Sequence, residues 1–323
     1  MVNSFLIFIF SVLISYLTVP IVNQFGKKLS ILDNPNFRKD HPKPLVRLGG
    51  LAIYIGFLIP NFIFHQSGLT NLENQNIINI FLICTFLFFF LGIIEDIFHI
   101  SLLIKLISQV LISSYACSQG FIINLSNFPF SQILEKANLY DLFSIFISII
   151  WIVGIVNAFN WVDGLDGLAS GLLIITSFGL FYLLINNDSN LYPIIILLGM
   201  IGSNFGFILH NYHPAKIFMG DGGSFFIGSV MALFSINPEI YSLNNTAGFV
   251  NIFAKILILG LPLLDMIYVI INRIVKNKSP FFPDRSHFHH RLLDLGINHK
   301  QTVIYCYAIH IVCLSIGIKI LIT

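Results

Sequence analysis

The chain has 323 residues, of which 56% are hydrophobic and only 10% are charged, and its mean hydropathy is +0.86. Soluble domains carry about 25% charged residues, so this composition excludes an ordinary soluble protein and indicates an integral membrane protein. The net charge of +2 is small, and the basic residues form no long run, which argues against nucleic-acid binding.

Ten apolar segments are candidates to cross the roughly 30 Å of hydrocarbon in a bilayer. In chain order we expect helices at 4–24, 48–65, 77–94, 101–123, 141–159, 168–186, 191–209, 223–237, 248–272 and 303–322. The first segment is followed by Lys27 and Lys28 and has no positive charge before it, the reverse of a signal peptide, so we expect it to remain as a span. The predicted fold is therefore all-α, with about ten transmembrane helices in a single domain, residues 1–323.

The basic residues fall almost entirely on one side of this arrangement. If the N-terminus is outside, all but three of the 17 Lys and Arg residues lie on the cytoplasmic side, the exceptions being Lys136, Lys255 and Lys319. Cytoplasmic loops of membrane proteins carry the excess of Lys and Arg, so both termini are expected to be extracytoplasmic. We predict a multi-pass protein of the plasma (inner) membrane.

The polar motifs fall on the same cytoplasmic face. They are IEDIFHI at 94–100, NWVDGLDG at 160–167, HNYHPAKIFMGDGG at 210–223 and PFFPDRSHFHHRLLDLG at 280–296. We therefore expect an active site in a cytoplasmic-face cleft. Asp265 is an exception because it falls inside the ninth segment, where an unpaired acid costs about 2.5–3.5 kcal/mol. Two roles are therefore considered for Asp265: pairing with a neighbouring helix, or catalysis.

Acidic and amide side chains are concentrated in these motifs. Such groups are hard ligands suited to Mg²⁺, which usually shares its coordination sphere with substrate phosphates. A single one is equally well explained as a solvated acid at a helix end, but several on adjacent loops favour a metal site. The candidates are Glu95, Asp96, Asn160, Asp163, Asp166 and Asp221.

Glycine-rich and basic segments supply complementary chemistry. In FMGDGGSFFIG, glycines around Asp221 allow close approach to an anion at a helix start, although Gly223 also suits helix packing alone. The PDRSHFHHRLL segment is able to clamp a diphosphate through charge-assisted hydrogen bonds. A solvated loop at lipid headgroups is its alternative, and zinc is disfavoured because the histidines lack i, i+4 spacing. NFRKDHPKPLVRLGG is either a positive-inside anchor or a cover for an anionic substrate.

Acidic residues for Mg²⁺, basic residues for phosphates and glycines for close approach all fall at one membrane surface. Together they indicate phosphoryl transfer to a lipid.

Five motifs resemble the polyprenyl-phosphate N-acetylhexosamine-1-phosphate transferases of glycosyltransferase family 4. These are RKDHPKPLVRLGG, GIIEDIFHISLLIKL, NAFNWVDGLDGLA, FMGDGGSFFIG and SPFFPDRSHFHHRLLDLG, in the family's order. The HFHH form is similar to the branch that acts on GlcNAc and begins O-antigen, common-antigen and teichoic-acid linkage synthesis.

The resemblance implies a reaction at the inner leaflet. Undecaprenyl phosphate attacks the β-phosphorus of a UDP-N-acetylhexosamine, which gives the undecaprenyl-diphospho-sugar and UMP. Mg²⁺ is the implied cofactor, with Mn²⁺ as a substitute, and a homodimer is a family-level expectation.

The resemblance also implies roles for individual residues. Asp221 is the main Mg²⁺ ligand with Asn160 beside it, and Asp166 with Gly167 forms part of the uridine pocket. The expected catalytic residues are Glu95, Asp96, Asp163 and His287, of which Asp96 would orient or deprotonate the lipid phosphate and Asp163 has no defined duty. The expected substrate-binding residues are Lys43, Arg47, Arg285, His289 and His290, and the histidines, His287 included, would hold the diphosphate with Arg285. Glu95 departs from the family, whose acidic pair is commonly Asp-Asp.

Two other functions are weighed against this one. DGLDGLA also opens the signature of CDP-alcohol phosphatidyltransferases, but that signature fails at Ser170, Leu183 and Asn187. A transporter with intramembrane acids would place its acids within spans, where this chain has Asp265 alone.

Overall fold

The computed structural model describes residues 2–34, 43–66, 75–125, 128, 130–185, 191–236, 248–280 and 285–322. Within these ranges the long helices are α1 (Val2–Lys28), α2 (Gly49–Gln66), α3 (Gln75–Phe98), α4 (Leu102–Ser118), α6 (Tyr140–Val162), α7 (Leu168–Ile185), α8 (Leu191–Asn211), α9 (Gly220–Ile236), α10 (Gly248–Val275) and α12 (His299–Ile322). Two short helices, α5 (Ser131–Lys136) and α11 (Phe288–Asp294), and an antiparallel strand pair, β1 (Leu32–Asp33) with β2 (Leu45–Val46), complete the described elements.

Every apolar segment predicted from the sequence forms one of the long helices. Among the described residues, α1, α3, α6, α7, α8, α10 and α12 are long and apolar enough to cross a membrane, and α2, α4 and α9 are shorter apolar helices. The chain is therefore a helical, multi-pass membrane protein. The short elements α5, α11, β1 and β2 were not expected, because their apolar runs are too brief to show a period.

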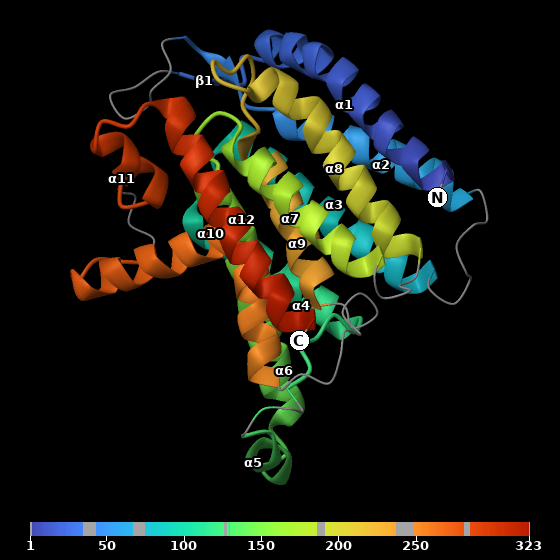
Figure 1. Cartoon of the computed structure of the whole chain (residues 1–323), viewed down its shortest axis with the longest axis vertical. Helices are drawn as coiled ribbons and strands as arrows, with labels where there is room; N and C mark the ends of the chain where they lie inside the picture. Colours follow the sequence, from blue (N-terminus) through green and yellow to red (C-terminus); the bar gives the residue numbers. More distant parts are fainter. Residues whose placement is uncertain are drawn as a thin grey trace.

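The helices place β1 and α11 toward one end of the molecule and α5 at the other (Figure 1). Helix α1 runs from the N-terminus toward β1, and α12 runs from the neighbourhood of α11 toward the C-terminus. The motifs on α3, α6 and α9 meet at the β1 and α11 end, because α3 and α6 end there and α9 begins there.

Helix α9 lies at the centre of the bundle and packs against α2, α3 and α6. Glycines make these contacts close: a Cβ on Gly50 would lie 2.1 Å from the Gly223 nitrogen, and one on Gly92 would lie 2.3 Å from the Asp221 carbonyl oxygen. Gly228 meets the Val156 backbone in the same way. The packing role weighed for Gly223 is thus confirmed, and these contacts hold the start of α9 in place.

Replacing Gly50 with alanine is expected to destabilise the protein by about 2–3 kcal/mol, because the new methyl group meets backbone that cannot move aside. The matched control is Gly154→Ala on α6, where a Cβ would meet only the Met266 methyl group at 3.6 Å. Thermal midpoints of the purified variants in detergent micelles measure both effects. Equal midpoints for the two variants would contradict the close packing of α2 on α9.

Helix α10 is broken rather than continuous, in contrast to the single helix expected at 248–272. Gly260 has φ 53° and ψ −127°, a conformation that suits glycine, and Pro262 lacks the N–H that a straight helix requires. The imidazole of His310 on α12 gives a backbone donor at the break a partner, since the Leu261 N–H donates to its Nδ1 at 3.2 Å. Its Nε2 lies 2.8 Å from the Thr176 hydroxyl oxygen on α7. Three helices therefore meet at the break.

Candidate functional site

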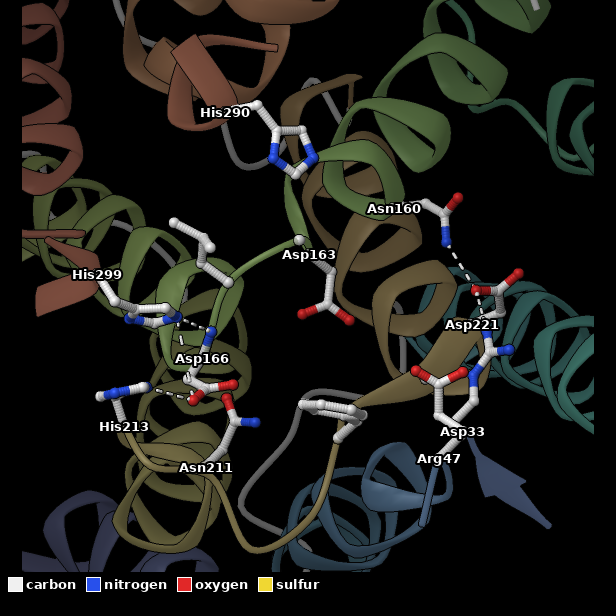
Figure 2. A pocket seen from close by; sticks show the side chains of 14 residues that line it. Asp33, Arg47, Asn160, Asp163, Asp166, Asn211, His213, Asp221, His290 and His299 are labelled. Atoms are coloured by element: carbon white, nitrogen blue, oxygen red, sulfur yellow. Dashed lines mark hydrogen bonds and ion pairs between the residues drawn. The ribbon is translucent and has the colours of Figure 1, made fainter. Parts of the chain in front are cut away.

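A cavity of about 330 Å³ lies at the β1 and α11 end, within the size range of small-molecule sites. Its walls come from strand β1, the C-terminal ends of α6 and α8, the starts of α9, α11 and α12, and the turns next to them (Figure 2). The lining residues are Asp33, Arg47, Asn160, Asp163, Gly164, Leu165, Asp166, Asn211, His213, Phe218, Gly220, Asp221, His290 and His299.

Two polar groups face each other across this cavity. Figure 2 shows Asp33, Arg47, Asn160 and Asp221 on one side, called here the Asp221 side. Asp166, Asn211, His213 and His299 lie on the other, called the Asp166 side. Asp163 and His290 lie between the two sides. The same cavity therefore offers carboxylates, a guanidinium and imidazoles to one ligand.

Asp221 is the centre of the first side and lies in the opening turn of α9. Its Oδ1 accepts from the Asn160 amide nitrogen at 3.0 Å and from the Arg47 guanidinium at 3.5 Å. Its Oδ2 lies 3.9 Å from the Lys105 ammonium, which also contacts Glu95 Oε1 at 3.5 Å. Burial lowers the pKa of Arg47, but the Asp96 and Asp221 carboxylates outweigh it and raise that pKa above its ordinary value. The cation therefore stays charged.

Asp96 supports Asp221 from behind. Its Oδ1 accepts the Asp221 N–H and its Oδ2 accepts the Gly222 N–H, both at 2.9 Å. Its Oδ1 also lies 3.4 Å from the Arg47 guanidinium, and its side chain has no exposed surface. Both carboxylate oxygens are thus occupied by the start of α9, and Asp96 does not line the cavity. These contacts favour a positioning role over direct action on a lipid phosphate.

The donor set around Asp221 fits a hard divalent cation. Asp221 and Asp163 both turn carboxylates into the cavity, and the Asn160 amide lies beside Asp221 (Figure 2). Removal from water and repulsion from Asp221 raise the pKa of Asp163 well above its ordinary value. A cation between these groups would relieve that repulsion, and one or two carboxylates with waters and substrate phosphates are what Mg²⁺ commonly takes.

The Asp166 side is held in shape by a network of hydrogen bonds. Asp166 Oδ2 lies 2.8 Å from His213 Nδ1 and accepts the Ala215 N–H at 3.1 Å. The Gly167 N–H donates to Asn211 Oδ1 at 2.9 Å, and the Asn211 amide donates to the Ile217 carbonyl. Gly167 has φ 77°, which favours glycine in this turn. The turn and the segment before α9 are thereby locked together.

His213 and His299 add a stacked pair of rings to this side. Their centroids lie 4.1 Å apart with an interplanar angle of 20°, and His299 Nε2 accepts the Asp166 N–H at 3.3 Å. Together with Asp166 they could hold a cation through one ligand atom each, but existing hydrogen bonds already engage the Asp166 carboxylate. With Phe218 and Leu165 nearby in the lining, the side suits a flat, polar ring.

The basic and histidine residues predicted to bind substrate are distributed unevenly. Arg47 and His290 line the cavity, whereas Lys43 is exposed outside it. Arg285 pairs with Asp294 at 3.2 Å on the surface.

His287 and His289 are buried behind the cavity wall. Burial and the neighbouring histidines lower the pKa of His289 well below its ordinary value, so this ring is neutral near pH 7. The predicted roles of Lys43, Arg285, His287 and His289 in substrate binding or catalysis stay predictions.

Several cavity residues were missed from the sequence. Asn211, His213 and Phe218 lie in the motif HNYHPAKIFMGDGG, in which the sequence predicts a role for Asp221 alone. His299 begins the last long helix, α12. Asp33 was given no role, and Lys105, which lies beside Asp221, counted only among the basic residues expected on the cytoplasmic side. A polar residue near the end of an apolar segment is the signal that Asn211, His213 and His299 share.

The fold and cavity define a multi-pass helical membrane protein with a polar site at one end that combines carboxylates, an arginine and histidines. The model of Glycosyl transferase family 4 matches residues 78–239. The chain belongs to this family, as the five motifs predicted.

Three relatives illustrate the similarity. The chain is 33% identical over 314 residues to the probable undecaprenyl-phosphate N-acetylglucosaminyl 1-phosphate transferase of Bacillus subtilis (strain 168), covering 96% of this chain and 82% of that protein. It is 33% identical over 312 residues to the undecaprenyl-phosphate alpha-N-acetylglucosaminyl 1-phosphate transferase of Pasteurella multocida (strain Pm70), covering 94% and 83%. For the decaprenyl-phosphate N-acetylglucosaminephosphotransferase of Mycobacterium tuberculosis (strain ATCC 25618 / H37Rv), identity is 31% over 317 residues, covering 91% and 77%. These relationships do not favour the transporter alternative.

Proposed function

We propose that the chain is a phosphoglycosyl transferase that moves GlcNAc-1-phosphate from UDP-GlcNAc to undecaprenyl phosphate and releases UMP. A phosphate oxygen of the lipid forms a bond to the β-phosphorus of the donor. The bond from that phosphorus to the bridging oxygen breaks, and UMP leaves with the electron pair. The names of the three relatives support this reaction.

The observation that carries the proposal is the pairing of two unlike sides within one cavity. The Asp221 side offers carboxylates and cations, as phosphates with a bound metal require, and the Asp166 side offers hydrogen-bonding groups and flat rings, as a nucleobase requires. A nucleoside diphosphate sugar carries both features. We therefore place the diphosphate at Asp221 and the uridine at Asp166.

Mg²⁺, or Mn²⁺ in its place, is the proposed cofactor, held by Asp221 with Asn160 and Asp163. When bound, it would neutralise charge on the phosphates. Arg47 and Lys105 stand beside Asp221 and supply further positive charge to the same region. Asp96 fixes the backbone that carries Asp221. Positioning and electrostatics account for most catalysis in phosphoryl transfer, and these residues provide both.

The cavity is proposed to open to the cytoplasm at the inner leaflet. The basic residues Lys27 and Lys28 end α1, and Arg273 lies in the last turn of α10, on the end that carries the cavity. Cytoplasmic ends of spans are enriched in such residues. A soluble nucleotide sugar and a membrane-bound acceptor phosphate would meet at this surface. The homodimer and the polymer built on the product stay predictions.

The test is UMP release by the purified protein supplied with undecaprenyl phosphate, Mg²⁺ and a panel of UDP-sugars. We expect release that needs the lipid and the metal together and that is fastest with UDP-GlcNAc. If UMP release is fastest with UDP-GalNAc, the proposed donor sugar is wrong, but the proposed reaction still holds. Absence of UMP with every donor would refute the proposed function.

Replacing Lys105 with glutamine is expected to lower kcat by about tenfold to a hundredfold, because it removes a cation 3.9 Å from Asp221 Oδ2. Lys136→Gln, at the exposed end of α5, is the matched control and should behave as wild type. Both are measured by UMP release at saturating substrates. Equal rates for the two variants would show that the Lys105 charge plays no part in the reaction.

A further inference from the structure

Asp265 is a buried acid within the apolar helix α10, and both of its carboxylate oxygens are engaged by the segment that begins α11. Oδ2 lies 2.8 Å from His287 Nδ1, and Oδ1 accepts the Phe288 N–H at 2.8 Å. A carboxylate only accepts hydrogen bonds, so His287 carries its proton on Nδ1. The Asp265 side chain is 3% exposed and that of His287 is 10% exposed. An intramembrane acid thus holds a loop and a helix start at two points.

His287 passes this restraint on to α6. Its ring packs edge-on against the Trp161 indole, with centroids 5.6 Å apart and an interplanar angle of 74°. The Arg273 guanidinium, from the same half of α10 as Asp265, lies 5.1 Å from the Trp161 ring. Trp161 directly follows the cavity residue Asn160. The start of α11 is therefore fixed to α10 and to the end of α6 that carries the cavity residue Asn160.

The first turn of α11 then reaches the cavity itself. His289 packs so closely on Gly164 that a Cβ there would lie 2.5 Å from the imidazole Nε2, and Gly164 belongs to the turn between Asp163 and Asp166. His290 follows and lines the cavity between its two sides. The position of His290 consequently depends on how α11 is anchored.

We propose that Asp265 is a positioning residue that docks α11 on the cavity through His287 and so controls binding of the nucleotide-sugar donor. The assignment of the cavity to that donor rests on the proposed function, whereas the docking itself rests on the contacts alone. Asp265→Asn is expected to release the anchor, because the His287 and Phe288 hydrogens meet different carboxylate oxygens, and the amide places an NH₂ donor where one of these oxygens stood.

Docking is measured without reference to catalysis through Trp161. The chain has two tryptophans, and Trp151 donates to Ser235 about 15 Å earlier along α6. In the Trp151→Phe background, Asp265→Asn and His287→Ala should each raise quenching of Trp161 by aqueous iodide about twofold, and the double variant should quench no more than either single one. Asp141→Asn, an exposed acid in the first turn of α6, is the matched control and should leave quenching unchanged.

Kinetics in the same background test the consequence for the donor. Asp265→Asn should raise KM for UDP-GlcNAc about tenfold and leave KM for undecaprenyl phosphate within about twofold. Unchanged quenching in Asp265→Asn, or effects of Asp265 and His287 that add in the double variant, would overturn the docking role. Equal increases in both KM values would overturn the link to the donor. If the wild-type protein releases no UMP with any donor, the proposed function fails. The quenching of Trp161 in the Trp151→Phe series then judges the docking alone.

Discussion

Asp221→Asn is expected to lower turnover by about a hundredfold or more while leaving the protein folded and inserted. The variant removes the one carboxylate that meets Asn160, Arg47 and Lys105 together. It keeps the backbone N–H that donates to Asp96, and it relieves charge repulsion with Asp163. The change should therefore strike the proposed metal and phosphate site without loosening α9.

Three measurements separate this loss from unfolding. UMP release reports turnover, the thermal midpoint in detergent reports the fold, and the electron paramagnetic resonance signal of free Mn²⁺ reports metal binding. We expect turnover and Mn²⁺ binding to fall together at an unchanged midpoint. Asp141→Asn at the far end of α6 should change none of them. Retention of more than about a tenth of the wild-type rate would argue against a metal role for Asp221.

The helical fold could be predicted because each helix that faces lipid must be apolar along its length. The break in α10 shows the limit of that argument. Gly260 and Pro262 mark a weak point in the sequence, but the partner that stabilises the break, His310, lies fifty residues further on and reaches it only through packing. The short helix α11 was likewise hidden, because its anchor is Asp265 on another element.

The candidate site was predictable where a motif carries its own chemistry. Asn160, Asp163, Asp166 and Asp221 came from two motifs, and all four line the cavity. Lys105 was missed as a site residue because its chemistry depends on α4 packing beside α3, which brings the ammonium to Glu95 and Asp221. Residue type and spacing alone do not show which side a helix presents to its neighbours.

The structure also separates residues that face the cavity from residues that hold it. Asp96 and Asp265 are both buried acids on apolar helices, and each accepts backbone N–H groups at the start of another helix. Asp96 fixes α9 and thereby Asp221, and Asp265 fixes α11 and thereby His290. The family resemblance predicts a catalytic role for Asp96, whereas its contacts with the start of α9 favour a role that acts through Asp221.

Asp96→Asn distinguishes these two roles. An amide has one accepting oxygen, so it satisfies the Asp221 N–H or the Gly222 N–H but leaves the other donor buried opposite an NH₂ group. Arg47 also loses one of its two carboxylate partners. Leaving such groups unpaired costs about 3 kcal/mol. We expect a lower thermal midpoint, weaker Mn²⁺ binding and turnover reduced by about tenfold to a hundredfold, because Asp221 is no longer held in place at the proposed metal and phosphate site.

A direct catalytic role gives a different pattern. If Asp96 acted on the lipid phosphate, Asp96→Asn would lose turnover at a normal midpoint and with normal Mn²⁺ binding, because Asp221 would stay in place. Asp33→Asn is the comparison variant. Asp33 lines the cavity and lies on strand β1, so this variant removes a charge without removing the contacts that hold α9. Since Asp96 holds two backbone N–H groups at the start of α9 and also contacts Arg47, its effect on Mn²⁺ binding should exceed that of Asp33→Asn.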